Sequence, residues 1–172
     1  LLYDLKKYDS FECVPMLIGV AGSGKSTWLN TIARFFGVED VGILSDNANE
    51  RFGLQDLLDK MVILCFEMTQ RFGLNQAQFQ SMVSGESVTA QTKNGQDVTI
   101  PKWKTPILVA GNSAPSYTDN NGSLLRRYLL LFFDSRVSPS EQDPNLEKAI
   151  ERELPLILVK AAIAYRTFCD RF

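Results

Sequence analysis

The residues with the clearest chemical potential form one glycine-rich stretch, GVAGSGKS at 19–26. It is a complete G-x-x-x-x-G-K-S pattern between an apolar run at 16–20 and a helix expected over 27–36. Its glycines let backbone N–H groups close around phosphate oxygens, and the helix N-terminus adds a positive dipole end. Lys25 would reach the β and γ phosphates, and Ser26 would offer its hydroxyl to Mg²⁺. We expect this stretch to bind ATP and Mg²⁺ as cofactors rather than to form a plain glycine-rich turn. The residues expected to bind the nucleotide are Gly19, Ala21, Gly22, Ser23, Gly24, Lys25, Ser26 and Thr27.

A carboxylate follows the apolar run at 61–66 and is the second candidate for chemistry. Glu67 is the first charge after that run, and a carboxylate at the end of a buried strand is costly unless it faces a cation. We expect Glu67 to hold Mg²⁺ together with Ser26 and to activate the attacking water. Phe66 stands where many such ATPases carry an aspartate, so Glu67 would serve both the metal and the water. The plainer interpretation is a strand that ends in a solvated glutamate.

Two polar features adjoin further apolar runs. Asn112 follows the expected strand at 107–110, and an amide there can orient the water beside the γ phosphate. Gly-Asn is also an ordinary turn pair. Arg126 and Arg127 directly precede the apolar run at 128–133, where an arginine can act as a finger toward a neighbour's γ phosphate. A simple phosphate or surface contact is the other interpretation of that pair.

The elements that must position these residues alternate between short apolar runs and helical spacing. Strands are expected at 16–20, 61–66, 107–110 and 128–133, and helical spacing occurs at 28–36, 54–58, 79–83 and 146–168. Wholly apolar strands that alternate with helices are typical of a parallel sheet covered on both faces, so the fold class is α/β. Pro155 predicts a break in the tail, with one helix at 143–154 and a second at 155–169. Together these would form a small C-terminal helical cap on the sheet.

One stretch, residues 87–100, departs from this alternation. Its β-branched runs flank Asn94-Gly95, which is the strongest short hairpin signal. We therefore predict a protruding β-hairpin with Lys93 at its tip. Trp103 lies between two lysines just after this hairpin, and we favour packing at the hairpin base over base stacking for its ring. Trp28 lies behind the phosphate loop at helical spacing and is predicted to join the core.

Composition excludes several classes. The 172 residues, 45% hydrophobic and 22% charged, suit one globular domain. Three cysteines and no histidine exclude a disulfide framework and histidine catalysis, and no apolar run is long enough to cross a membrane. A reducing, intracellular location follows, and because the chain begins at Leu1 we expect it to be part of a longer protein.

Charge is unevenly distributed along the chain. The net charge of −2 argues against a broadly nucleic-acid-binding surface. Residues 88–127, however, carry five basic and two acidic side chains, whereas residues 134–153 carry three basic and six acidic ones. Any contact with nucleic acid should therefore lie in the segment from the hairpin to the arginine pair.

The four chemical elements, in this order and with a hairpin between the second and third, resemble the superfamily 3 helicases. These are a viral and plasmid branch of the AAA+ ATPases, and the resemblance points in particular to the primase-helicases of poxviruses, other large DNA viruses and phages. It covers about residues 15–135 and rests on the segments GVAGSGKST, VILCFEM, FQSMVSGESVTAQTKNG, PILVAGNSAP and GSLLRRYLLLFF. The most specific part is Gly85-Glu86 feeding the hairpin, because the phosphate loop alone is widespread.

The resemblance implies an AAA+ ATPase core at 15–137, the end of an upstream helical segment at 1–14 and a helical cap at 138–172. It implies a homo-hexameric ring with ATP between subunits, in which the hairpins grip single-stranded DNA or a replication fork at the replication site of a host cell. No membrane is involved. The implied catalytic residues are Lys25, Glu67, Asn112 and Arg127 from the adjacent subunit, with Arg126 as a fallback, and the implied DNA contacts are Lys93 and Asn94.

The pattern departs from the family at two positions, and alternatives stay open. Gln80 and Gln91 stand where the family often has a lysine and, nearby, an arginine, so neither is assigned a phosphate contact.

Lys93 would simply be solvated if the hairpin were an ordinary turn. The rival function is a P-loop ATPase that acts as a nucleic-acid or protein assembly switch without unwinding. A small-molecule kinase is disfavoured because no acceptor base is evident.

Overall fold

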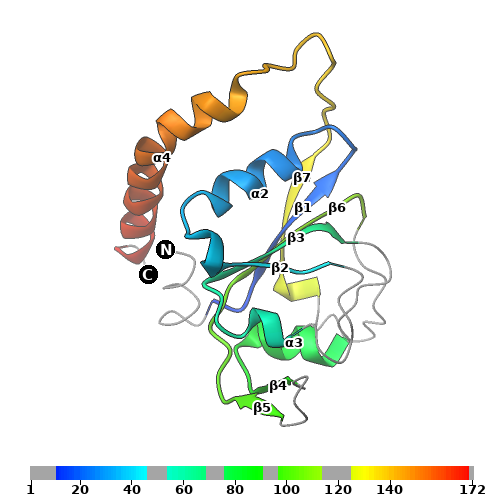
Figure 1. Ribbon diagram of the computed structural model, residues 1–172, viewed down its shortest axis with the longest axis vertical. Helices are drawn as coiled ribbons and strands as arrows, with labels where there is room; N and C mark the ends of the chain where they lie inside the picture. Colours follow the sequence, from blue (N-terminus) through cyan, green and yellow to red (C-terminus); the bar gives the residue numbers. More distant parts are fainter. Residues whose placement is uncertain (1–10, 46–53, 69–75, 91–96, 114–124, 171–172) are drawn as a thin grey trace.

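The computed structural model describes residues 11–45, 54–68, 76–90, 97–113 and 125–170 (Figure 1). Seven strands, three helices and three short 3₁₀ turns occur in these ranges. In chain order they are β1 (Val14–Gly19), α2 (Lys25–Ala33), η1 (Val38–Asp40), β2 (Val41–Ile43), η2 (Gln55–Leu57), β3 (Val62–Met68), α3 (Gln76–Ser84), β4 (Val88–Ala90), β5 (Val98–Ile100), β6 (Ile107–Gly111), η3 (Leu125–Arg127), β7 (Tyr128–Phe133) and α4 (Leu146–Cys169).

Five of the strands form a parallel sheet in the order β2-β3-β6-β1-β7. On β1, Leu17 pairs with Ala110 of β6 on one side and with Leu131 of β7 on the other. Because all five strands run in the same direction, the residues that follow β1, β3 and β6 emerge at one edge of the sheet. The α/β class with a central parallel sheet is confirmed, and this carboxyl edge carries the candidate residues.

Both faces of the sheet are buried along β1, β3 and β6, which explains their continuous apolar runs, whereas the edge strand β7 leaves Leu129, Leu130 and Phe132 exposed. Successive side chains of a strand point to opposite faces, and the core divides accordingly into two clusters. Leu17, Leu64 and Leu108 face α2, together with Leu29 of that helix. The other face meets α3 and the hairpin through Met16, Cys65, Val109, Phe79 and Met82. Trp28 packs against the α2 side of the core, as predicted.

The predicted hairpin is present as the antiparallel pair β4–β5, at the end of the molecule opposite the phosphate loop (Figure 1). Val88 pairs with Ile100 and Ala90 with Val98; the turn at 91–96 lies outside the described residues. Trp103 is 1% exposed, and its indole N–H donates to the Thr105 carbonyl oxygen at 2.9 Å. Its predicted role in packing is confirmed, and a buried ring cannot stack on a nucleic-acid base.

The tail corrects one prediction, because α4 is a single helix from Leu146 to Cys169 that runs through Pro155. A proline inside a helix costs about 3 kcal/mol. The apolar stripe nevertheless keeps one helical period across Pro155, so a single helix aligns the whole stripe on one side; its half-buried members are Ile150, Leu154, Ile157, Ala161 and Tyr165. The expected C-terminal helix is thus present but unbroken.

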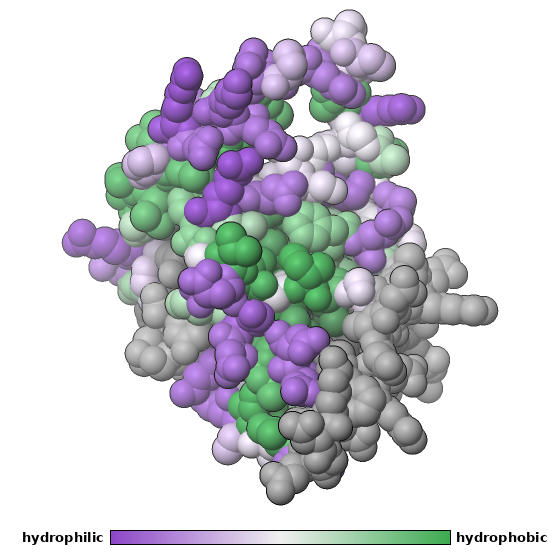
Figure 2. Space-filling view, in the orientation of Figure 1, coloured by the Kyte–Doolittle hydropathy of each residue, from purple (hydrophilic) through white to green (hydrophobic). Residues whose placement is uncertain are grey.

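The position of α4 also differs in detail from a cap laid on the sheet. It lies outside α2 (Figure 1), where Arg34, the residue that caps the C-terminus of α2, bonds to Glu147 at 3.1 Å. No residue of α4 is buried, and Leu156, Val159 and Ile163 are each more than half exposed. Figure 2 shows hydrophobic surface over this helix.

Two smaller differences concern short elements. The strand β2 was not predicted, because three residues with a central glycine give no apolar run. The helical spacing at 54–58 corresponds to the 3₁₀ turn η2 rather than to an α-helix. Among the described residues, no helix combines the length and apolarity that a bilayer span requires.

Candidate nucleotide-binding site

The phosphate loop joins β1 to α2 and is shaped by two glycines. Gly24 caps α2 in the left-handed region with φ 93°, which glycine adopts without strain, and its carbonyl accepts the Trp28 N–H at 3.0 Å. Gly19 lies so close to β7 that a Cβ there would collide with the Phe133 carbonyl. That carbonyl accepts the Val20 N–H at 3.2 Å, so the loop begins directly against the neighbouring strand.

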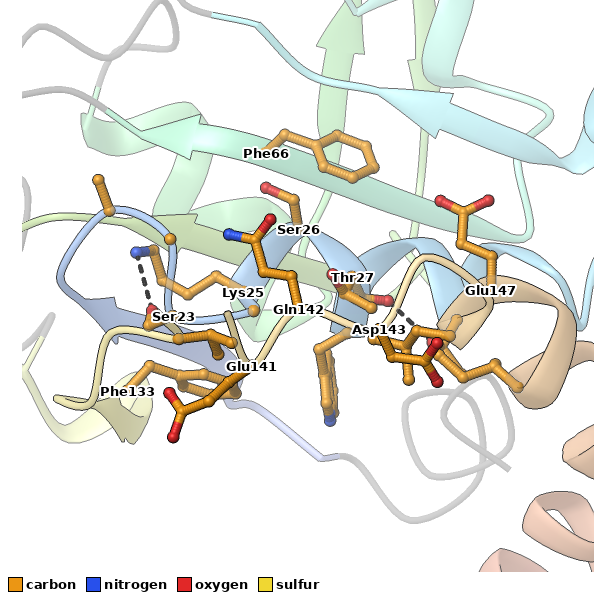
Figure 3. Close-up of a pocket in the computed structure, with 18 of the residues that line it drawn as sticks. Ser23, Lys25, Ser26, Thr27, Phe66, Phe133, Glu141, Gln142, Asp143 and Glu147 are labelled. Atoms are coloured by element: carbon orange, nitrogen blue, oxygen red, sulfur yellow. Dashed lines mark hydrogen bonds between the residues drawn. The ribbon is translucent and has the colours of Figure 1, made fainter. Parts of the chain in front are cut away.

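Lys25 is held within the curve of this loop (Figure 3). Its ammonium donates to the carbonyl oxygens of Gly19 at 2.8 Å and Val20 at 2.7 Å, with Ser23 Oγ at 3.5 Å. An ammonium carries three donors and no acceptor, so oxygen atoms of any ligand in the loop can replace these partners. The positive charge is therefore placed where the sequence motif requires it.

The predicted residues Lys25, Ser26, Glu67 and Asn112 line one cavity of about 1050 Å³. Its floor is the phosphate loop, and its other lining residues on the sheet include Phe66 and Gly111, from the ends of β3 and β6. Four side chains that are separated by up to 87 positions in the sequence meet because parallel strands place their carboxyl ends at the same edge. All eight residues predicted to bind the nucleotide belong to this loop or to the start of α2, and seven of them line the cavity.

A β-bulge sets the direction of Glu67. Cys65 pairs with Val109 and Met68 with Gly111, so three steps along β3 match two along β6. The extra residue lets the neighbouring Phe66 and Glu67 both line the cavity, whereas successive residues of a regular strand point to opposite faces. Bulges commonly re-aim a side chain next to a functional site. Glu67 is exposed to this cavity rather than buried, which suits a group that meets a ligand.

Sequence reasoning missed the wall of the cavity that faces away from the sheet. This wall is the connection after β7 and the start of α4, including Val137, Gln142, Asp143, Leu146 and Ile150 (Figure 3). The Val137 N–H donates to the Gly22 carbonyl at 3.1 Å, which ties the connection to the phosphate loop. At the α4 end, Arg34 reaches Glu147 and, at 4.0 Å, Glu151. No motif marks this segment, and only its packing reveals its place.

The same wall carries negative charge at its rim. Hydrogen bonds from the Ser138 hydroxyl at 2.7 Å and from its backbone N–H at 3.1 Å lower the pKa of Glu141. Glu141 therefore stays ionised at lower pH than an ordinary glutamate. The cavity therefore has the positive charge of Lys25 on the loop side and the carboxylate of Glu141 on the outer side.

The arginine pair lies elsewhere. Arg127 is not among the residues that line the cavity, and its Nε donates to Ser84 Oγ at the end of α3 at 2.9 Å. Next to it, the ring of Tyr128 stacks on Phe79 of α3 with centroids 6.2 Å apart. Arg126 is exposed. Within one chain the pair is separate from the phosphate loop, and the predicted DNA contacts Lys93 and Asn94 lie outside the described residues.

The fold and the loop geometry together define a P-loop α/β domain. The chain belongs to DUF5906, a family of unknown function whose model matches residues 17–127.

Two solved structures share the fold. The apo A form of the NrS-1 C-terminal region matches with TM-score 0.66 and 16% identity over 89% of this chain. A JCV helicase with bound N-(4-(2-(thiazolo[5,4-c]pyridin-2-yl)phenoxy)phenyl)acetamide matches with TM-score 0.54 and 16% identity over 87% of this chain. This chain spans 37% and 45% of those chains. At such identity the likeness concerns the fold, which is helicase-like.

Proposed function

We propose that this chain is the ATP-hydrolysing motor domain of a DNA helicase, of the superfamily 3 branch of AAA+ ATPases. The observation that carries the proposal is the meeting of Lys25, Ser26, Glu67 and Asn112 in one cavity at the carboxyl edge of the sheet. The helicase-like fold supports the same class. In this proposal the domain serves a viral or phage replicative primase-helicase at the site of DNA replication in the host cell.

Each residue of the cavity has a distinct part in hydrolysis. Lys25 would trade its loop carbonyls for the β and γ phosphate oxygens and stabilise the charge that builds up there. Ser26 and Glu67 would hold Mg²⁺, and Glu67 would also take the proton of the attacking water. Asn112 would orient that water for in-line attack on the γ phosphorus.

The proposal places ATP between subunits of a homo-hexameric ring. An arginine from the Arg126-Arg127 pair of the adjacent subunit, Arg127 by resemblance, would complete the site, which fits its position outside the cavity of its own chain. The hairpins would then line the channel, with Lys93 and Asn94 on single-stranded DNA. Movement of the hairpins with each hydrolysis step would draw one strand through the ring.

ATP turnover tests the site directly. Lys25→Ala should abolish it, and Glu67→Gln should lower it by about 100-fold or more while ATP still binds, because a lost transition-state group typically costs that much. Phosphate release measures turnover, and a fluorescent ATP analogue measures binding. Lys160→Ala, on exposed α4, is the control for loss of one lysine. Turnover in Lys25→Ala equal to that of the unaltered chain would overturn the assignment.

Two further experiments separate the motor from an assembly switch without unwinding. In a mixture of Arg127→Ala chains and Glu67→Ala chains, some interfaces combine the intact Glu67 of one chain with the intact Arg127 of its neighbour. These composite sites should restore some ATP turnover if Arg127 acts between subunits. Failure to recover any, with assembly intact, would contradict the action between subunits. DNA-stimulated turnover that Lys93→Ala abolishes would favour the motor, whereas DNA binding without stimulation would favour the switch.

A further inference from the structure

A second cavity lies at the opposite, amino edge of the sheet. It has a volume of about 460 Å³ and is formed between the segment that enters β3 and the segment that joins β5 to β6. Five residues of β6, at about 3.3 Å each, separate its rim from the nucleotide cavity by roughly 16 Å. The two cavities share no lining residue.

This amino-edge cavity is lined by three lysines, Lys60, Lys102 and Lys104. No aspartate or glutamate is among the described residues that line it. In a chain with more acidic than basic residues, three lysines that line one cavity without a carboxylate concentrate positive charge there.

Buried side chains fix the lysines in place. Exposure alternates along 102–105: Lys102 and Lys104 are exposed, whereas Trp103 and Thr105, which also line the cavity, are buried. The Thr105 hydroxyl donates to the Lys60 carbonyl at 2.8 Å, which joins the two walls. The Lys60 ammonium is held at the edge of the cavity, where it donates to the carbonyl of Glu39, a residue that does not itself line the cavity.

The shape and place of the cavity favour an extended polyanion. Its apolar part comes from Leu58, Met61 and Ile100, and Ile100 is the last residue of the hairpin strand β5. A groove with ammonium groups and apolar surface suits the alternation of phosphates and bases in a single strand. Its position at the hairpin base would continue any path that starts at the hairpin tip.

We propose that Lys60, Lys102 and Lys104 form a phosphate-binding groove for single-stranded nucleic acid at the base of the hairpin. The proposal rests on the proposed function, since it extends the contact of the motor with its DNA strand from the hairpin tip to the sheet. It assigns these lysines a role that is independent of ATP hydrolysis.

The test is the salt dependence of binding to a fluorescein-labelled oligo(dT), measured by anisotropy with the 172-residue chain. Lys102→Ala with Lys104→Ala removes two exposed ammonium groups and leaves the buried anchors intact. The slope of log K against log[salt] should become shallower by about 1.4, because each single-strand phosphate contact contributes about 0.7. Lys102→Arg with Lys104→Arg should keep the original slope, because arginine also contacts phosphate.

The matched control is Lys148→Ala with Lys160→Ala, which removes the same charge from exposed positions on α4. An equal change of slope in this control would overturn the groove, because net charge alone would then explain the effect. An unchanged slope in the Lys102/Lys104 variant would overturn it too. So would loss of inorganic pyrophosphate binding with DNA binding retained, since that outcome marks a small-anion site.

These outcomes stay distinct from failure of the proposed function. If the unaltered chain does not bind oligo(dT) at all, the DNA part of the proposed function fails together with the groove. If it binds but the double variant behaves as the unaltered chain, only the groove fails. ATP turnover should be unchanged in the Lys102/Lys104 variant when no DNA is present.

Discussion

The two edges of the sheet are built on different principles. The carboxyl edge combines an ammonium, a hydroxyl, a carboxylate and an amide from Lys25, Ser26, Glu67 and Asn112 around one cavity. The amino edge presents a single kind of charge, from lysines that are anchored by Trp103 and Thr105. Chemistry at a phosphorus atom needs several groups in fixed geometry, whereas attraction of a polyanion needs only charge of one sign.

This difference predicts how each edge responds to change. A substitution at the carboxyl edge should alter turnover steeply and depend little on salt, because its groups act at short range. A substitution at the amino edge should alter affinity gradually and mainly through salt dependence. Arg127 is the exception to this difference, because it directly precedes β7 at the amino edge, where its partner Ser84 belongs to α3, the helix that leads into the hairpin.

The largest expected effect tests this exception. Arg127→Ala should lower ATP turnover about 1000-fold, because an arginine finger contributes roughly 10³–10⁵ in rate. Ser84→Ala removes only the hydroxyl that accepts from Arg127 Nε and should leave turnover nearly unchanged. Phosphate release in the presence of DNA measures both.

Two results would change this assignment. Equal losses in Arg127→Ala and Ser84→Ala would indicate that Arg127 acts by positioning α3 rather than at a neighbour's phosphate. A loss in Arg126→Ala without one in Arg127→Ala would assign the finger to Arg126, which is exposed.

A smaller effect is expected on stability at the carboxyl edge. Gly19→Ala should lower the free energy of unfolding by about 3 kcal/mol, because its Cβ would collide with the Phe133 carbonyl and force β1 away from β7. Gly24→Ala meets no atom within 4 Å and should cost only about 1 kcal/mol for its left-handed backbone. Urea unfolding of both variants gives the comparison, and equal losses would contradict the close approach of β7.

The smallest effect concerns the anchor of the amino edge. Thr105→Val removes the hydroxyl that donates to the Lys60 carbonyl and should lower the free energy of unfolding by about 1 kcal/mol. Thr89→Val is the control, because its hydroxyl bonds to Thr99 at an exposed site, where such changes stay within about 0.5 kcal/mol. Urea unfolding measures both, and a larger loss in Thr89→Val would argue against a built amino-edge groove.

Much of the fold follows from local patterns. Apolar runs predicted β1, β3, β6 and β7 within a few residues, and Asn94-Gly95 between β-branched runs predicted the β4–β5 pair. These signals are strong because buried strands and hairpin turns restrict residue type at each position. The edge strand β2 and the unbroken α4 were not predicted. Pairing with β3 forms β2 in spite of its weak local signal, and in α4 the period of the apolar stripe continues through Pro155.

The candidate site was predicted only in part. Motifs identified Lys25, Ser26, Glu67 and Asn112, and the structure brings them together. The outer wall around Gln142 was missed, because it has no motif and depends on the path of the chain after β7. At the amino edge, Lys102 and Lys104 were visible only as part of an excess of positive charge in residues 88–127, and Lys60 lies outside that segment.

The sequence by itself determined the phosphate loop, the parallel α/β class and the hairpin, since each depends on residue types within a short window. Tertiary structure alone decided the bulge that turns Glu67 into the cavity, the wall that closes over the loop, and the meeting of Lys60 with Lys102 and Lys104. Those features depend on strand order and register. Burial of both faces of the sheet fixes order and register through contacts between residues far apart in the chain.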